Sequence, residues 1–211
     1  MTVAKSALKR KLSKVDYADT NPVRFAQFLL GKFLMVRSVE GLTGGIICET
    51  EAYDGPRDKA SHSFGNRRTA RTEVMFAPGG LAYVYLCYGI HYLFNVITGD
   101  IDVPQAVLIR AVKVTEGREL AARRRKGVPE KHWASGPGKV SVALGIHGKH
   151  QGNDLTGETI WIEDRGIVVP KREIQKSARI GVDYAEEWAL KPWRFVWEPK
   201  GAEALAKIGA A

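Results

Sequence analysis

Apolar and polar residues alternate along most of this chain in short runs with a period of two, the pattern of half-buried strands rather than of long helices. Gly, Pro, Asn and Asp residues stand between the runs and mark turns. The pattern predicts strands over residues 33–39, 42–53, 81–88, 91–98, 105–112, 159–163, 174–180 and 193–197.

Helices are predicted at fewer places. Asn21 and Pro22 suit the cap and the first position of a helix that Gly31 can end. Thr115 can cap a second helix that runs to Lys126, with acids early and bases late, as the helix dipole favours. Two shorter helical segments are expected after the glycine-rich turn at 135–139 and at 183–186, which has capping-box spacing.

The order of these elements predicts an α+β fold in a single domain, with a strongly bent, largely antiparallel sheet and a few flanking helices. We expect the domain to cover residues 20–200, because no linker, repeat or low-complexity tract interrupts it. Residues 1–19 are rich in Lys and Arg and are expected to form a basic, loosely ordered arm. Residues 201–211 would be a C-terminal tail.

The stretch from residue 46 to residue 62 is the centre of the functional interpretation. A period of two places Ile47, Glu49, Glu51 and Tyr53 on one face of a strand and Ile46, Cys48, Thr50 and Ala52 on the other, mostly apolar face. A carboxylate beside an aromatic ring, with the imidazole of His62 following the turn, suits a site that holds a flat substrate and activates water. Alternatively, Glu49 and Glu51 form the solvated face of an edge strand, and this stretch alone does not separate the two.

Charge narrows the choice of partner. The chain has 211 residues, and 32 Lys and Arg against 23 Asp and Glu leave a formal net charge of +9. Such a balance favours a polyanion, most simply nucleic acid, over an anionic membrane surface or mere solubility. The loop at 54–73 is polar and basic, and a loop of that length in a compact domain is typically functional.

The sequence features that are present and absent limit the compartment and the cofactors to be expected. Cys48 and Cys87 lie in apolar runs and are expected to be buried free thiols of a reducing compartment. No apolar run reaches the ~18 residues that span a bilayer, and no secretory signal is evident, so we expect an intracellular protein of the cytoplasm or nucleoid, or of the nucleus in a eukaryote. The five histidines match no zinc-binding spacing, and we expect neither a metal nor a cofactor.

A carboxylate, several aromatic residues and a basic surface remain, and together they suit nucleobases and phosphates. Stacking one base on an aromatic ring contributes ~1–3 kcal/mol, so two or three rings can offset the few kcal/mol needed to extrude a base from a duplex. Tyr83 is expected to pack in the sheet instead. The turn at 135–139 exposes backbone N–H groups that can hold a phosphate, although it lacks Walker A spacing.

Ten short motifs in register then give the chain a resemblance. They are Glu49-Thr50-Glu51-Ala52-Tyr53, Gly55-Pro56, Ala60-Ser61-His62-Ser63, Met75-Phe76-Ala77-Pro78-Gly79, Tyr83-Val84-Tyr85, Tyr88-Gly89, Asn95-Val96, Leu108-Ile109-Arg110-Ala111, Ser135-Gly136-Pro137-Gly138-Lys139 and Lys191-Pro192-Trp193-Arg194-Phe195. Over roughly residues 20–198 the chain resembles the alkyladenine (3-methyladenine) DNA glycosylases, the alkyl-purine glycosylases without a helix-hairpin-helix. The resemblance implies a monofunctional base-excision repair enzyme that flips a damaged purine, hydrolyses its N-glycosidic bond and leaves an abasic site.

The resemblance also implies roles for single residues. Glu51 matches the residue that deprotonates and orients the attacking water, and Arg110 matches one near that water and the target phosphate. Lys139 would contact DNA phosphate. The implied partner is double-stranded DNA containing an alkylated, etheno- or deaminated purine, with no membrane and no obligate protein partner.

Other matches concern the base itself. Tyr53, His62 and Tyr85 match residues that enclose the flipped base, and Asn95 matches one that resists guanine by crowding its exocyclic amine. Tyr88 matches the wedge that fills the gap left in the duplex. Two readings compete with this one: a non-catalytic nucleic-acid-binding module with an aromatic stacking platform, and a related hydrolase of RNA or free nucleosides.

Overall fold

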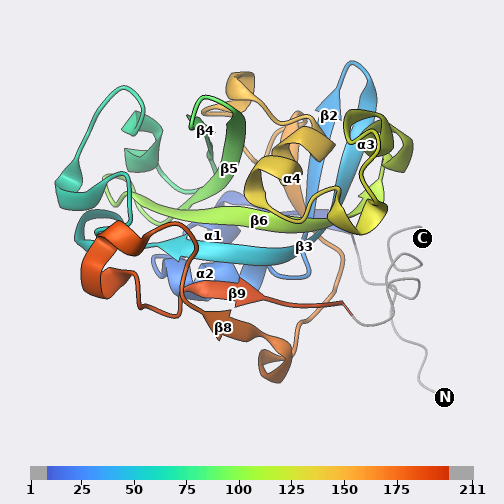
Figure 1. The fold of residues 1–211 in the computed structure, drawn as a ribbon. Coiled ribbons are helices and arrows are strands. Elements are labelled where there is room, and N and C mark those ends of the chain that lie inside the picture. Colours follow the sequence, from blue (N-terminus) through green and yellow to red (C-terminus); the bar gives the residue numbers. More distant parts are fainter. Residues whose placement is uncertain (1–8, 200–211) are drawn as a thin grey trace.

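One sheet of nine strands organises the part of the chain that the computed structural model describes, residues 9–199 (Figure 1). Its strands are β1 (Arg10–Lys11), β2 (Phe33–Ser38), β3 (Gly41–Tyr53), β4 (Ala82–Cys87), β5 (His91–Thr98), β6 (Gln105–Glu116), β7 (Ile160–Asp164), β8 (Gln175–Ser177) and β9 (Arg194–Val196). They follow the order β1-β7-β2-β3-β6-β5-β4, and β9 pairs with both β3 and β8. Every pairing is antiparallel, which confirms the predicted α+β fold with its bent antiparallel sheet.

The long strands β3 and β6 form the spine of this sheet and are also where it bends. Their register shifts at Gly44/Gly45 and on both sides of Glu49. A Cβ at Gly45 would lie 2.0 Å from the Lys113 carbonyl oxygen, so the close approach of β6 requires a glycine there. Such bulges bend a strand and increase its twist. Beyond them β3 exchanges its neighbour β2 for β9, so both of its edges are paired around Glu49 to Glu51.

Helices cover both faces of the spine. The helix α2 (Pro22–Leu29) starts as predicted, because the Asn21 side chain accepts a hydrogen bond of 2.9 Å from the Arg24 N–H. In Figure 1 this helix lies below β3, with which it is in contact, and α4 (Pro137–Leu144) lies above β6, in contact with β5 and β6. The remaining helices are α1 (Lys14–Tyr17) and α3 (Arg118–Arg124).

Two predicted helix starts are wrong. Thr115 caps no helix but belongs to β6, because pairing with β3 extends that strand to Glu116; α3 begins only after Gly117, which has a φ of 61°. The capping box expected at Asp183 is absent. The 3₁₀ segment Asp183–Trp188 has no side-chain cap, and Glu186 inside it has a φ of 52°.

The predicted strand at 174–180 is reduced to the three residues of β8. The other short 3₁₀ turns are Gly55–Arg57, Phe64–Asn66, Glu73–Phe76, Glu130–His132, Gly148–His150 and Lys171–Glu173. Three of these organise the basic loop after β3, so that loop has local structure of its own.

The loosely ordered arm predicted for residues 1–19 is wrong from residue 10 onward. The strand β1 pairs with β7, and the side chains of Leu12 and Tyr17 are buried in the main core. Arg10 pairs with Asp16 at 2.8 Å, which further fixes the segment. Residues 1–8 of the arm, and the tail predicted at 201–211, lie outside the described residues. Within 9–199 no helix is long and apolar enough to cross a membrane.

Candidate active site

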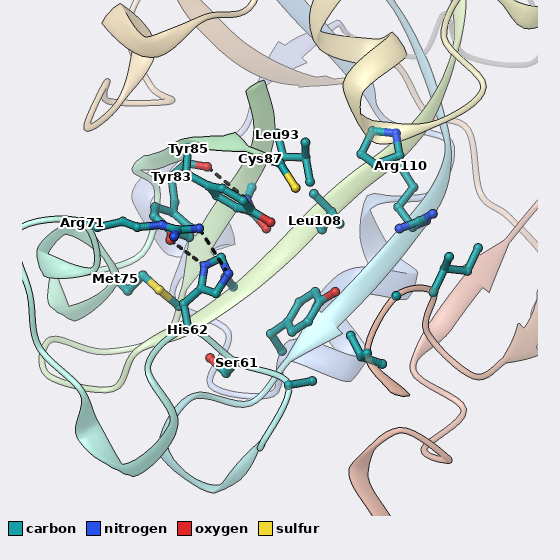
Figure 2. A pocket seen from close by; sticks show the side chains of 18 of the residues that line it. Ser61, His62, Arg71, Met75, Tyr83, Tyr85, Cys87, Leu93, Leu108 and Arg110 are labelled. Atoms are coloured by element: carbon teal, nitrogen blue, oxygen red, sulfur yellow. Dashed lines mark hydrogen bonds between the residues drawn. The ribbon is translucent and has the colours of Figure 1, made fainter. Parts of the chain in front are cut away.

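A cavity of about 450 Å³ opens where four parts of the chain meet: the β4–β5 hairpin, the paired spine of β3 and β6, the basic loop after β3, and the segment after β8. Figure 2 shows His62, Tyr83 and Tyr85 together on one side of it, beside Arg71 and Met75, with Arg110 on the other side. A volume of this size suits a small flat ligand.

Glu51 lies directly behind the cavity wall rather than in it. Its side chain has no exposed surface, and it is not among the lining residues. Its Oε1 accepts a hydrogen bond of 2.8 Å from the Ile180 backbone N–H, and its Oε2 accepts from the Tyr53 hydroxyl at 2.9 Å and from Arg110 Nη1 at 3.2 Å. All three donor residues line the cavity, so the carboxylate is one layer from the ligand space.

These surroundings set the charge of Glu51. Burial is the largest influence and raises the pKa of the Glu51 carboxyl above its ordinary value, and the Arg110 charge and the hydrogen bonds from Ile180 and Tyr53 offset this rise only in part. Burial and the adjacent carboxylate also hold the pKa of the Tyr53 phenol well above its ordinary value, so that this hydroxyl remains a proton donor. The three donors therefore favour the ionised carboxylate against the opposing effect of burial, in a site that water hardly reaches.

A second carboxylate completes this side. Arg110 Nε donates to Glu49 Oε1 at 3.0 Å, and Arg194 Nε donates to the same oxygen at 2.5 Å. Glu49 and Glu51 are thus bridged by one guanidinium. The alternative interpretation, a solvated edge strand, is wrong because β3 is paired on both edges here and Glu51 is fully buried.

The alternation predicted along β3 holds for its second half only. Thr50 faces α2, where its hydroxyl donates to the Ala26 carbonyl at 2.9 Å, and Glu51 and Tyr53 face the cavity side. Ile46 and Ile47 are both buried in the core, because the bulge beside Glu49 resets the pattern. A strict period of two had placed Ile47 on the polar face.

An aromatic wall, defined here as His62, Tyr83 and Tyr85, faces that carboxylate side. The ring centroids of His62 and Tyr85 lie 4.7 Å apart with planes at 76°, and those of Tyr83 and Tyr85 lie 5.2 Å apart. Tyr83 and Tyr85 share a face of β4, as the alternation predicts. The prediction that Tyr83 only packs in the sheet missed its second role, since its hydroxyl lies 2.7 Å from His62 Nδ1.

His62 is held in its neutral form. Burial, and then the charges of Arg71 and Arg67, lower the pKa of the imidazole to about 4. Arg71 Nη2 lies 3.4 Å from His62 Nε2, and its guanidinium lies 4.6 Å from the Tyr85 ring centroid. The sequence analysis did not single out Arg71 within the basic loop at 54–73; its position nine residues after His62 was the available signal.

The other predicted residues are placed as follows. Asn95 on β5 is buried in the cavity wall, and its Nδ2 donates to the Tyr83 carbonyl at 3.1 Å. Tyr88 lies in the β4–β5 turn at the rim, 93% exposed, with a φ of 50°. It therefore projects from the turn instead of lying on a strand face. A left-handed conformation is strained for an aromatic residue, and such strain gathers at functional sites.

Lys139 lies outside this constellation. It is exposed in the first turn of α4 and does not line the cavity, although Pro137 does. The glycine beside it has a packing reason, because a Cβ at Gly138 would lie 2.9 Å from His91 Cβ. A role of Lys139 toward phosphate stays a prediction.

Cysteines and metal ligands add little to the site. Cys48 and Cys87 are free and half-buried, and burial raises the pKa of the Cys48 thiol to about 12. Cys87 lines the cavity. Among residues 9–199 no group of three His, Cys, Asp or Glu side chains is arranged to hold a metal ion.

Comparison with known proteins gives one consistent answer. The family model described as "Methylpurine-DNA glycosylase (MPG)" matches residues 16–200. A protein of Chlamydia pneumoniae is 43% identical over 186 residues, which cover 87% of this chain and 93% of the relative. One of Bacillus cereus is 45% identical over 197 residues, covering 87% and 94%. Both relatives carry the name "Putative 3-methyladenine DNA glycosylase".

Proposed function

The chain belongs to the methylpurine-DNA glycosylase family, and from this premise we propose that the cavity beside Glu51 receives a damaged purine flipped out of duplex DNA. As a member of that family it is a DNA N-glycosylase, a base-excision repair hydrolase that acts on alkylated purines. The residues that perform each step are the proposal. One observation carries it: a fully buried carboxylate with three donors lies across a small cavity from a wall of aromatic rings.

Base recognition is assigned to the aromatic wall together with Tyr53. Stacking contributes ~1–3 kcal/mol per base, which offsets the few kcal/mol that extrusion costs. A purine alkylated on a ring nitrogen is cationic. His62 remains neutral above pH 5 because its pKa lies at about 4, so it hydrogen-bonds the base edge without repelling this charge. Asn95, held by its bond to the Tyr83 carbonyl, would crowd an exocyclic amine.

Hydrolysis is assigned to Glu51. As the purine leaves, the sugar gains oxocarbenium character, and an ionised carboxylate nearby stabilises that charge and accepts the proton of the attacking water. An alkylated, cationic purine is already a good leaving group, so one carboxylate suffices for it. Arg110 and Tyr53 favour the ionised form of Glu51 against burial and line the space through which the water reaches it.

Duplex binding is assigned to the rim. Tyr88 projects from the strained hairpin turn and would fill the gap that the flipped nucleotide leaves. Lys139 is expected to contact phosphate; Arg110, 9% exposed and bridging two acids, contributes to phosphate binding only through the cavity mouth. We expect the protein to act where chromosomal DNA lies, in the nucleoid or nucleus, and to need no protein partner.

The decisive experiment is single-turnover base release in EDTA from duplexes carrying one ethenoadenine or hypoxanthine and from methylated DNA, with wild type, Glu51→Gln and Glu49→Gln. General-base catalysis contributes about 10²–10⁴-fold, so Glu51→Gln should lose that much while still binding the lesion. Glu49→Gln is the matched control on the same strand. It removes a carboxylate that bonds only arginines, and its loss should be clearly smaller.

The competing readings predict other results. A stacking platform without catalysis would release no base in any variant and would bind lesions equally well with Glu51→Gln. A hydrolase of free nucleosides would show weak salt dependence, whereas several phosphate contacts make affinity for DNA fall steeply with salt. In Lys139→Ala the slope of log affinity against log salt concentration should become smaller by about one. An unchanged slope would mean that Lys139 does not contact phosphate.

A further inference from the structure

Arg179, in the segment that follows β8, is buried and bonded to three separate parts of the chain. Its side chain and that of Asp58 have no exposed surface, and the two pair through Nη1–Oδ2 at 2.5 Å and Nη2–Oδ1 at 2.8 Å. Its Nη1 also donates to the Ala52 carbonyl at 2.8 Å, and its Nη2 to the Trp188 carbonyl at 3.1 Å. The guanidinium therefore joins the end of β3, the basic loop and the C-terminal segment.

The same guanidinium borders two of the three groups that bond Glu51. Its Cζ lies 4.7 Å from the Tyr53 ring centroid, and the Tyr53 hydroxyl donates to Glu51. The next residue along the chain, Ile180, supplies the backbone N–H that donates to the other carboxylate oxygen. The Trp193 ring also packs on the Arg179 guanidinium, with its centroid 5.2 Å from Cζ.

Stability alone does not account for such an arrangement. Removing both charges from water costs several kcal/mol per ion, and well-packed apolar residues often replace a buried ion pair without loss. Within residues 9–199, Arg179 Nε is also buried without a hydrogen-bond partner, a further cost. A planar fork does what an apolar side chain cannot, since it fixes two carbonyl groups and a carboxylate at set angles.

We propose that Arg179, clamped by Asp58, is a positioning residue of the glycosylase reaction that holds the Ile180 amide and the Tyr53 hydroxyl on Glu51. The proposal rests on the assignment of Glu51 as the base. Both bonds favour the ionised form of Glu51, so loosening them raises the pKa of that carboxyl. Because the base must be ionised, the acidic limb of the pH–rate profile then moves to higher pH.

A matched control exists elsewhere in the sheet. Arg165 is equally buried, pairs with Glu163 at 2.8 Å and with Glu116 at 2.9 Å, and lies 4.1 Å from the Phe33 ring centroid. None of these contacts lines the cavity. Arg165→Lys and Glu163→Gln therefore disturb a comparable buried ion pair without touching the neighbours of Glu51.

The test compares Arg179→Lys and Asp58→Asn with these two controls and with Glu51→Gln. Single-turnover excision is measured against pH with the folded enzyme in excess, so that the rate constant does not depend on the fraction folded. Both Arg179→Lys and Asp58→Asn should move the acidic limb upward by about one pH unit, the shift expected for one lost hydrogen bond to a charged group. On that limb the rate falls about 10-fold. The controls should unfold at lower urea concentration with the limb unmoved.

The outcomes separate the two proposals. An unmoved limb in folded Arg179→Lys and Asp58→Asn, together with inactive Glu51→Gln, overturns the positioning role and leaves the base assignment standing. Activity in Glu51→Gln overturns the base assignment. If neither Arg179→Lys nor Asp58→Asn folds, Trp193→Leu takes their place, because it removes a ring that packs on the guanidinium and so lets Arg179 shift away from Tyr53 and Ile180. A limb that stays unmoved in this variant also overturns the proposal.

Discussion

On one side of the cavity a carboxylate is fixed by charge and hydrogen bonds; on the other, three rings are fixed by packing. Glu51 receives its donors from β3, β6 and a segment 129 residues away along the chain. The aromatic wall is built from two residues of β4, Tyr83 and Tyr85, and from His62 in the basic loop. Charge stabilisation depends steeply on distance and dielectric, whereas stacking tolerates small displacements. Changes on the carboxylate side should therefore alter the chemical step and its pH dependence, and changes in the wall should alter binding.

After the loss of Glu51 itself, the largest effect is expected from Arg110→Met. The Arg110 charge lowers the pKa of Glu51, and an opposite charge at this range shifts a carboxyl by about one to three pH units. Without it the acidic limb of single-turnover excision should rise by that amount, and activity lost at pH 7 should return in part at higher pH. A loss that is the same at every pH would mean that Arg110 acts through the DNA and not through Glu51.

Next in size is Tyr85→Leu, which removes one ring of the wall. Affinity for a lesion duplex should fall by about 5- to 150-fold, the equivalent of ~1–3 kcal/mol of stacking. The excision rate at saturating enzyme should change much less. Fluorescence anisotropy with lesion-containing and undamaged duplexes measures the difference, and equal loss on both duplexes would place Tyr85 outside base recognition.

A smaller effect is expected from Tyr83→Phe, which removes only the hydroxyl 2.7 Å from His62 Nδ1. One neutral hydrogen bond contributes about 1 kcal/mol, so lesion binding should weaken by about 5-fold as His62 loses its partner. Tyr17→Phe is the control. Its hydroxyl contacts the Leu155 carbonyl in the main core, and its loss should affect urea unfolding alone. If Tyr83→Phe and Tyr17→Phe weaken lesion binding equally, the Tyr83 hydroxyl has no specific role in the site.

The smallest effect concerns His62→Gln and the pH dependence of stability. The folded protein holds the pKa of His62 at about 4, below the ordinary 6.5, so between these values the unfolded chain binds a proton that the folded one does not. Acidification through this window should destabilise wild type more than the variant, and above pH 6.5 the difference should be constant. Urea unfolding at pH 4.5 and 7.5 measures it; a difference independent of pH contradicts the neutral histidine.

Local sequence determined most of the elements and half of the site. Strand periodicity identified the strands of the spine and the Asn21 cap started α2, because each depends on neighbouring residues only. The same alternation placed Glu51 beside Tyr53 and Tyr83 beside Tyr85. These pairs, with the family motifs, were enough to predict a glycosylase.

Tertiary structure decided everything that depends on distant contacts. Pairing with β3 places Thr115 in a strand and not at a helix cap. Burial of Leu12 and Tyr17 makes part of the predicted basic arm belong to the folded domain. The raised pKa of Glu51 and the lowered pKa of His62 follow from burial and from charges that folding brings near. Arg179 and Asp58, 121 residues apart, carry no pattern that links them. Periodicity and caps act over a few residues, whereas burial, pairing and pKa exist only once the chain has folded.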